Sequence, residues 1–131
     1  MIIKTLVEEK DRIDFLPKHL GNKHLKFEML VYSLMDSFTK DYSGGFWNFW
    51  TLDNDGIFMT LDSIQSFEVI NPMNYFEDTM TAEALSIGVN IFALNALMDE
   101  SCDQRIIDYF YALRDFAAEH KECNQIFGLI D

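Results

Sequence analysis

Four carboxylates in the last predicted helix are spaced so that they could act together. At 100° per residue of an α-helix, Asp108, Asp115, Glu119 and Glu122 fall within about 60° of one another. If the helix extends to Glu122, they form an acidic ridge, to which we assign Asp131 at the end of the chain. The acidic ridge lies opposite the apolar stripe of the same helix. We interpret it either as a solvated face or as a surface that docks on a basic groove, including one that binds DNA.

The three histidines, His19, His24 and His120, are the other candidates for chemistry. No HExxH, His-x-His or paired-cysteine pattern accompanies them, so the sequence predicts no metal site and no cofactor. The GxSxG, P-loop and GxGxxG signatures are also absent. We therefore predict that the protein is not an enzyme, and that no pocket joins a histidine to Asp, Glu or Cys for proton transfer. A small cytosolic hydrolase that uses one of the three histidines is the alternative.

The charge of the chain restricts its partners. The 131 residues carry 22 acidic and 10 basic side chains, a net charge of −12. Residues 1–65 hold 10 acids and 7 bases, whereas residues 66–131 hold 12 acids and 3 bases, so the net charges are −3 and −9. This balance disfavours direct binding to nucleic acid or to an anionic membrane. It suits a basic protein partner, and a generic acidic adaptor protein is a second alternative function.

Length and hydropathy indicate one globular domain in the cytoplasm. At 131 residues, 49% of them hydrophobic, the chain can form a single domain over residues 1–131 without a metal or disulfide. The most apolar run, residues 84–98, is shorter than the roughly 20 residues of a membrane span, and no signal peptide is recognisable. Two cysteines without CxxC spacing favour reduced cytosolic thiols. The oligomeric state is left open by the sequence.

The elements that must position these residues follow from hydrophobic periodicity. Helical spacing predicts helices over residues 22–40, 81–98 and 103–119, with Asn22 and Thr81 as N-caps. Strand-like patterns between them, at residues 46–52, 57–61, 66–70 and 75–80, predict an antiparallel sheet over residues 45–80. Residues 1–21 are interpreted as an N-terminal leading segment that Pro17 and Gly21 interrupt. The predicted fold is α+β, with about three or four strands packed on about three or four helices.

Several short strings, in order along nearly the whole chain, resemble those of the antirestriction protein family typified by KlcA and ArdB. The most distinctive is residues 41–47, in which Tyr42, Gly44, Gly45 and Trp47 match a Tyr-x-Gly-Gly-x-Trp signature. The other matching strings are Arg12 to Gly21 with its Phe-Leu-Pro, Phe27-Glu28 with Val31-Tyr32, Thr81 to Leu94, Tyr109 with Leu113 to Phe116, His120-x-Glu122, and Ile130-Asp131.

The resemblance implies an inhibitor of type I restriction endonucleases that protects incoming plasmid or phage DNA. Its implied partners are the subunits of the restriction-modification enzyme, reached by protein–protein contact or by partial DNA mimicry. Three departures from the family pattern are present: Asp53-Asn54-Asp55-Gly56 in place of Asn-Gly-Gly, Ala84-Leu85-Ser86 in place of Ala-Ala-Gly, and Lys121 in place of Pro. The last departure would allow the final helix to run on past His120.

Overall fold

The computed structural model describes residues 1–131 and has the predicted α+β fold. Helical patterning changes to strand patterning near residue 45 and returns at Thr81, as the sequence predicts. The elements, in chain order, are β1 (Lys4–Leu6), η1 (Glu9–Asp11), α1 (Arg12–Leu20), η2 (Gly21–Lys23), α2 (His24–Phe38), β2 (Trp47–Leu52), β3 (Ile57–Leu61), β4 (Ser66–Asn71), β5 (Phe76–Thr81), α3 (Ala82–Ser101), α4 (Gln104–Ala118) and α5 (Cys123–Ile130).

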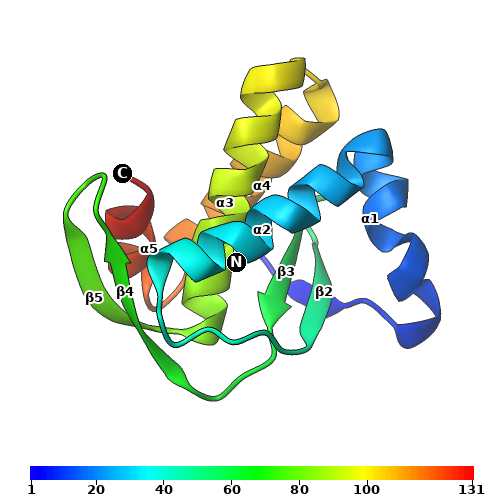
Figure 1. The fold of residues 1–131 in the computed structure, drawn as a ribbon. Helices are drawn as coiled ribbons and strands as arrows, with labels where there is room; N and C mark the ends of the chain where they lie inside the picture. The colour runs from blue at the N-terminus through cyan, green and yellow to red at the C-terminus, as the bar shows by residue number, and fades with distance from the viewer.

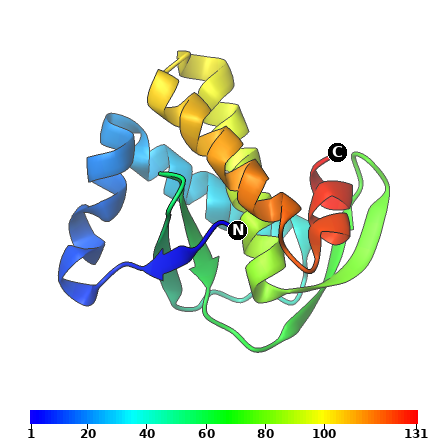
Figure 2. The ribbon, with the colours of Figure 1, turned by 180° about the vertical axis from the view of Figure 1, so that it is seen from behind.

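The strands form two antiparallel sheets, so the prediction of one sheet over residues 45–80 is wrong. β1, β2 and β3 make one sheet in that order, and β4 pairs only with β5. The two views of the ribbon show the three-stranded sheet and the β4–β5 hairpin on opposite sides of α3 (Figures 1 and 2). The separation has a physical cause at the outer edge of β3.

Side chains of α3 occupy the edge of β3 that a fourth strand would need. The Asn90 amide accepts from the Met59 N–H at 3.0 Å and donates to the Met59 carbonyl at 2.8 Å. Ser86 Oγ accepts from the Leu61 N–H at 3.0 Å. Four helical residues rise about 6 Å and two strand residues about 6.8 Å, so the two spacings match. Because these edge groups are already bonded, β4 cannot join the sheet and pairs with β5 instead.

Helix α3 is the centre of the molecule, and both sheets, α2, α4 and α5 pack around it. It is buried on all sides over most of its length, as its nearly continuous apolar sequence predicts. Gly88 lets the Leu129 side chain of α5 approach closely, since a Cβ at Gly88 would lie 2.7 Å from Leu129 Cδ2. None of the helices combines the length and the hydropathy that a membrane span requires.

The N-terminal region contains more regular structure than the sequence predicts. β1 pairs with β2, with Lys4 opposite Leu52, and α1 continues through Pro17 to Leu20. Gly21, with φ of 58°, ends α1, as expected for a glycine that interrupts a helix. Asn22 is not an N-cap, because a short 3₁₀ turn carries the chain from Gly21 into α2 at His24.

The last predicted helix ends earlier than the acidic ridge requires. α4 starts after Asp103, whose carboxylate accepts from the Arg105 N–H at 2.9 Å, and it ends at Ala118. His120 and Lys121 lie in a turn, and a separate helix, α5, follows. Glu119 is the residue at which α4 ends, and Glu122 lies beyond the turn, so Glu122 does not continue the helical face that carries Asp108 and Asp115.

Candidate functional site

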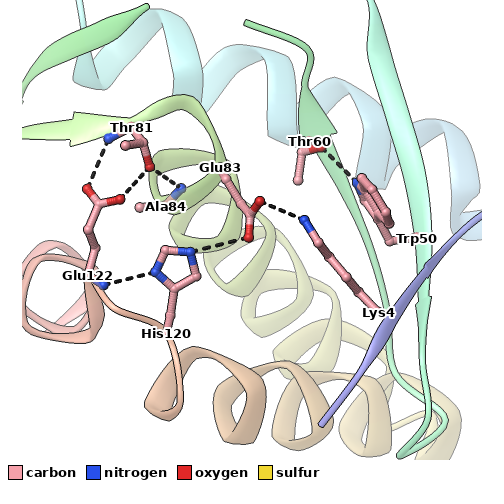
Figure 3. Close-up of polar contacts among 8 residues, drawn as sticks. All are labelled: Lys4, Trp50, Thr60, Thr81, Glu83, Ala84, His120 and Glu122. Carbon is pink, nitrogen blue, oxygen red and sulfur yellow. Dashed lines mark hydrogen bonds and ion pairs between the residues drawn. The ribbon is translucent and has the colours of Figure 1, made fainter. Parts of the chain in front are cut away.

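Five polar side chains from distant parts of the sequence meet at the start of α3 and form what we call the polar cluster: Lys4, Thr81, Glu83, His120 and Glu122 (Figure 3). Lys4 comes from β1, and Thr81 and Glu83 from the junction of β5 with α3. His120 and Glu122 come from the turn between α4 and α5. The polar cluster thus connects the first strand, the central helix and the last turn of the chain.

Glu122 holds the end of the β4–β5 hairpin against the α4–α5 turn. Its carboxylate accepts from the Thr81 N–H at 3.0 Å and from the Thr81 hydroxyl at 2.5 Å. The Thr81 oxygen in turn accepts from the Ala84 N–H at 3.2 Å, which confirms the predicted N-cap of α3. The carboxylate therefore reaches the helix cap through the threonine and faces inward, away from the predicted acidic ridge.

Both ring nitrogens of His120 are already engaged within the protein. The Glu122 N–H donates to Nδ1 at 3.0 Å, and because a backbone amide can only donate, Nδ1 must be the acceptor. The neutral ring then carries its proton on Nε2, which lies 3.3 Å from Glu83 Oε1 and donates to it. The side chain is only 9% exposed. No lone pair of the neutral imidazole is left to take a proton from a substrate.

Glu83 is the shared acceptor of the polar cluster. Lys4 Nζ donates to its other oxygen at 2.7 Å and also lies 4.2 Å from the centre of the Trp50 ring. The hydrogen bond from His120, followed by that from Lys4, lowers the pKa of Glu83 to about 2, against the opposing effect of burial. Trp50 is itself fixed by its Nε1–H, which donates to Thr60 at 2.8 Å. The carboxylate is thus an anion held between two donors.

A histidine and a carboxylate, His120 and Glu83, meet beside a cleft. They line an open hollow of about 700 Å³. Its remaining lining comes from the N-terminus, the β3–β4 connection, the start of α3 and the end of α4: Met1, Ile2, Ser63, Ile64, Gln65, Thr81, Ala82, Phe116, Glu119 and Lys121. The engaged nitrogens of His120 give this pair a connecting role rather than the open base that acid–base chemistry requires.

The other two histidines lie far from the polar cluster. His24 donates from Nδ1 to the Gly21 carbonyl at 2.8 Å and so closes the turn that opens α2. His19 Nδ1 lies 3.0 Å from the Tyr109 hydroxyl. Burial, followed by the nearby charges of Lys18 and Arg105, lowers the pKa of His19. No group of three or more His, Cys, Asp or Glu side chains comes together in a way that could hold a metal ion.

The predicted acidic ridge is divided between three elements. Asp108 and Asp115 are exposed on α4, and Asp108 accepts from Gln104 at 2.8 Å. Glu119 is exposed at the end of α4, where it accepts from the Ile2 N–H at 2.7 Å. Asp131 is exposed at the C-terminus, whereas Glu122 turns inward to Thr81. Four of the five predicted residues therefore present their charge to solvent.

The Tyr-x-Gly-Gly-x-Trp residues build the connection between α2 and β2. Gly44 and Gly45 have φ of 91° and 146°, conformations that L side chains rarely adopt. A Cβ at Gly45 would also lie 2.9 Å from Leu61 Cδ1. Trp47 is buried, and the Tyr42 ring packs edge-on against it at 6.2 Å. These residues therefore have a clear architectural role.

The polar cluster is the site that reasoning from the sequence missed. The contacts between its elements join residues 37 to 79 positions apart, and only Thr81, as a helix cap, belongs to a recognised local motif. The sequence does contain the two strings Thr81-Ala82-Glu83 and His120-x-Glu122. Each resembles the family, but nothing in the sequence indicates that the two are in contact. The structure brings the two strings together.

Comparison with known proteins gives a consistent assignment. A model of the antirestriction protein family matches residues 40–131. The antirestriction protein KlcA of Escherichia coli is 35% identical and matches 99% of this chain and 94% of its own length, and a second KlcA from the same species is 32% identical over 99% and 95%. A solved structure of the KlcA and ArdB proteins superposes with a TM-score of 0.91 at 33% identity, covering 99% of this chain and 95% of that one. The chain belongs to the antirestriction protein family.

Proposed function

We propose that this protein protects unmodified DNA from type I restriction systems by binding a protein component of the restriction enzyme in the cytoplasm. The observation that carries the proposal is the match to KlcA and ArdB over 99% of the chain, at a TM-score of 0.91. The report of that structure describes antirestriction activity against type I DNA restriction systems in vivo but not in vitro. The whole fold, rather than one segment, is shared with proteins of that activity.

The protein acts without catalysing a reaction. In the polar cluster, where a histidine is bonded to a carboxylate beside a cleft, both nitrogens of His120 are bonded within the chain. An inhibitor that acts by binding needs a surface complementary to its target and no reactive centre. The hydrolase alternative would need a histidine with a free lone pair, and His120 has none in this cleft.

Charge favours a protein partner over DNA. The net charge of −12, most of it in residues 66–131, repels a phosphate backbone and attracts a basic protein surface. We assign the electrostatic part of the contact to the acidic ridge, through its solvent-facing members Asp108, Asp115, Glu119 and Asp131. The inward position of Glu122 leaves it a supporting role. The exposed carboxylates of the acidic ridge also give this surface a partial resemblance to a polyanion such as DNA.

The plating efficiency of unmodified phage on a host with a type I system tests the proposal, because it measures protection inside the cell. Wild-type protein is expected to raise plating efficiency strongly, and no protection would refute the proposed function. The four substitutions Asp108→Asn, Asp115→Asn, Glu119→Gln and Asp131→Asn should reduce protection. Charge pairs at interfaces contribute about 1.5 kcal/mol or more, so a loss of about tenfold is expected if one such pair forms.

The matched control removes four acidic charges from exposed positions in the other half of the chain: Glu9→Gln, Asp11→Asn, Asp14→Asn and Asp36→Asn. This variant changes the net charge by the same amount and should keep protection near that of wild type. Equal protection by both variants would show that the acidic ridge only keeps the protein soluble.

A further inference from the structure

The tip of the β4–β5 hairpin exposes large apolar side chains that no part of the chain covers. We define the hairpin tip as residues 70–75. Met73 is 88% exposed and Tyr75 is 93% exposed, and Ile70 beside them is also exposed. The hairpin projects from the side of α3 opposite to the three-stranded sheet, with the C-terminus next to it (Figures 1 and 2). Aromatic and methionine side chains are enriched in protein interfaces and depleted from free surfaces.

The hairpin tip is held rigidly on α5. Asn71, which is buried, donates from its amide to the Leu129 carbonyl at 3.0 Å. Asn74 donates to the Gly128 and Leu129 carbonyls at 3.1 and 3.0 Å. The amide oxygens of the same two residues accept from the N–H groups of Met73 and Phe76, each at 3.0 Å. The turn that carries Met73 and Tyr75 is thus hydrogen-bonded both within itself and to α5. Because its backbone is already ordered, binding costs little conformational entropy.

Tyr75 occupies a backbone conformation that is unfavourable for its type. Its φ is 62°, in the left-handed region where a bulky residue is uncommon and glycine is free of strain. The neighbouring Phe76 instead packs against Gly128, where a Cβ would lie 2.8 Å from the Phe76 ring. The Tyr75 side chain therefore does not stabilise the fold, because it packs against nothing and its residue has an unfavourable φ.

The hairpin and the last ten residues of the chain contain acidic side chains and no basic ones. The hairpin, residues 66–81, contains Glu68, Glu77 and Asp78, and residues 122–131 contain Glu122 and Asp131. Neither segment contains a lysine, arginine or histidine. A partner complementary to this region offers an apolar recess for Met73 and Tyr75, with basic side chains around it.

We propose that the hairpin tip is the apolar anchor by which the chain binds a protein with such a basic-rimmed apolar recess. The inference rests on the proposed function, and it identifies the partner surface as part of the type I restriction enzyme. Exposed acidic residues attract the partner at a distance and mainly change association, whereas buried anchors set how long the complex lasts.

The test combines Met73→Ser with Tyr75→Gly in the phage plating assay. Both changes remove exposed side chains, and glycine suits the φ of residue 75, so the urea midpoint should stay the same or rise. Protection should fall by about tenfold or more, as expected when anchor residues are lost. The control is Ile13→Ser with Met29→Ser, two apolar residues that are also exposed, on α1 and α2. This control should protect as well as wild type.

A photo-crosslinking residue at position 75 identifies the partner directly in restricting cells. The expected product joins the protein to a tagged subunit of the restriction enzyme, and the same probe at position 13 should not form it. Undiminished protection by the hairpin variant, equal loss in the control, or crosslinking at position 75 only to a second copy of this chain would each overturn the inference. A wild-type protein that gives no protection would instead refute the proposed function, and the inference with it.

Discussion

The base and the tip of the β4–β5 hairpin use their side chains in opposite ways. At the base, Thr81 belongs to the polar cluster, where donors and acceptors bond to one another. At the tip, Met73 and Tyr75 face solvent without a protein neighbour that covers them. In this hairpin, the polar residues of the base therefore have a structural role, and the apolar residues of the tip are available for contact. For a family of inhibitors, unsatisfied apolar surface is a better guide to function than clustered titratable groups.

The largest effect on the base should come from Glu122→Ala. This change removes the acceptor for the Thr81 N–H and hydroxyl, so we expect a loss of about 2–3 kcal/mol in the free energy of unfolding. Urea unfolding at neutral pH measures it. Asp115→Ala, a matched change at an exposed position of α4, should cost less than about 0.5 kcal/mol. Equal stability of the two variants would contradict the role of Glu122 as a structural contact.

His120→Ala should have the next largest effect, on stability rather than on activity. The Glu122 N–H loses its acceptor and Glu83 loses a donor, with an expected cost of about 1–2 kcal/mol. Phage plating at equal levels of folded protein should show protection within a few-fold of wild type. His19→Ala and His24→Ala should behave likewise. Complete loss of protection by a folded histidine variant would revive the hydrolase alternative and erase the contrast between base and tip.

A further effect should appear in the pH dependence of Glu83. Its folded pKa of about 2 lies below the unfolded value of 4.5, so the ionised carboxylate stabilises the fold at higher pH. This stabilisation is complete above about pH 4.5 and declines as the pH falls towards about 2. Thermal unfolding should therefore show a gap in Tm between wild type and Glu83→Gln that narrows over this range. A gap that stays constant from neutral pH to about pH 2 would contradict the prediction.

Local patterns were sufficient to predict most of the elements. The α2, α3 and α4 helices follow from apolar spacing, and the β2–β3 hairpin follows from two aromatic runs around Asp53-Asn54-Asp55-Gly56. The Thr81 cap was also predictable, because a threonine before an apolar helical run has a known backbone partner. In each case the deciding interactions lie within a few residues of one another.

Contacts between distant residues were not predictable in the same way. β1 has three residues, and nothing near it in the sequence indicates that Lys4 pairs with Leu52. The division into two sheets depends on Ser86 and Asn90, two polar residues within an apolar helix whose partners lie on β3. The polar cluster likewise needs the turn at His120 to meet Thr81, 41 residues away from Glu122. Spacing along one helix placed Glu122 on a ridge, but tertiary contacts turned it inward.

The bonds from Ser86 and Asn90 to β3 also bear on aggregation. Residues 46–52 and 57–61 are rich in aromatic and β-branched residues and contain no charged side chain, a composition typical of segments that stack into cross-β assemblies. An open β3 edge would offer its backbone groups to another molecule. Once α3 is seated, the Met59 N–H and carbonyl and the Leu61 N–H are already bonded, so this part of the edge is open mainly in newly made chains whose central helix has not yet docked.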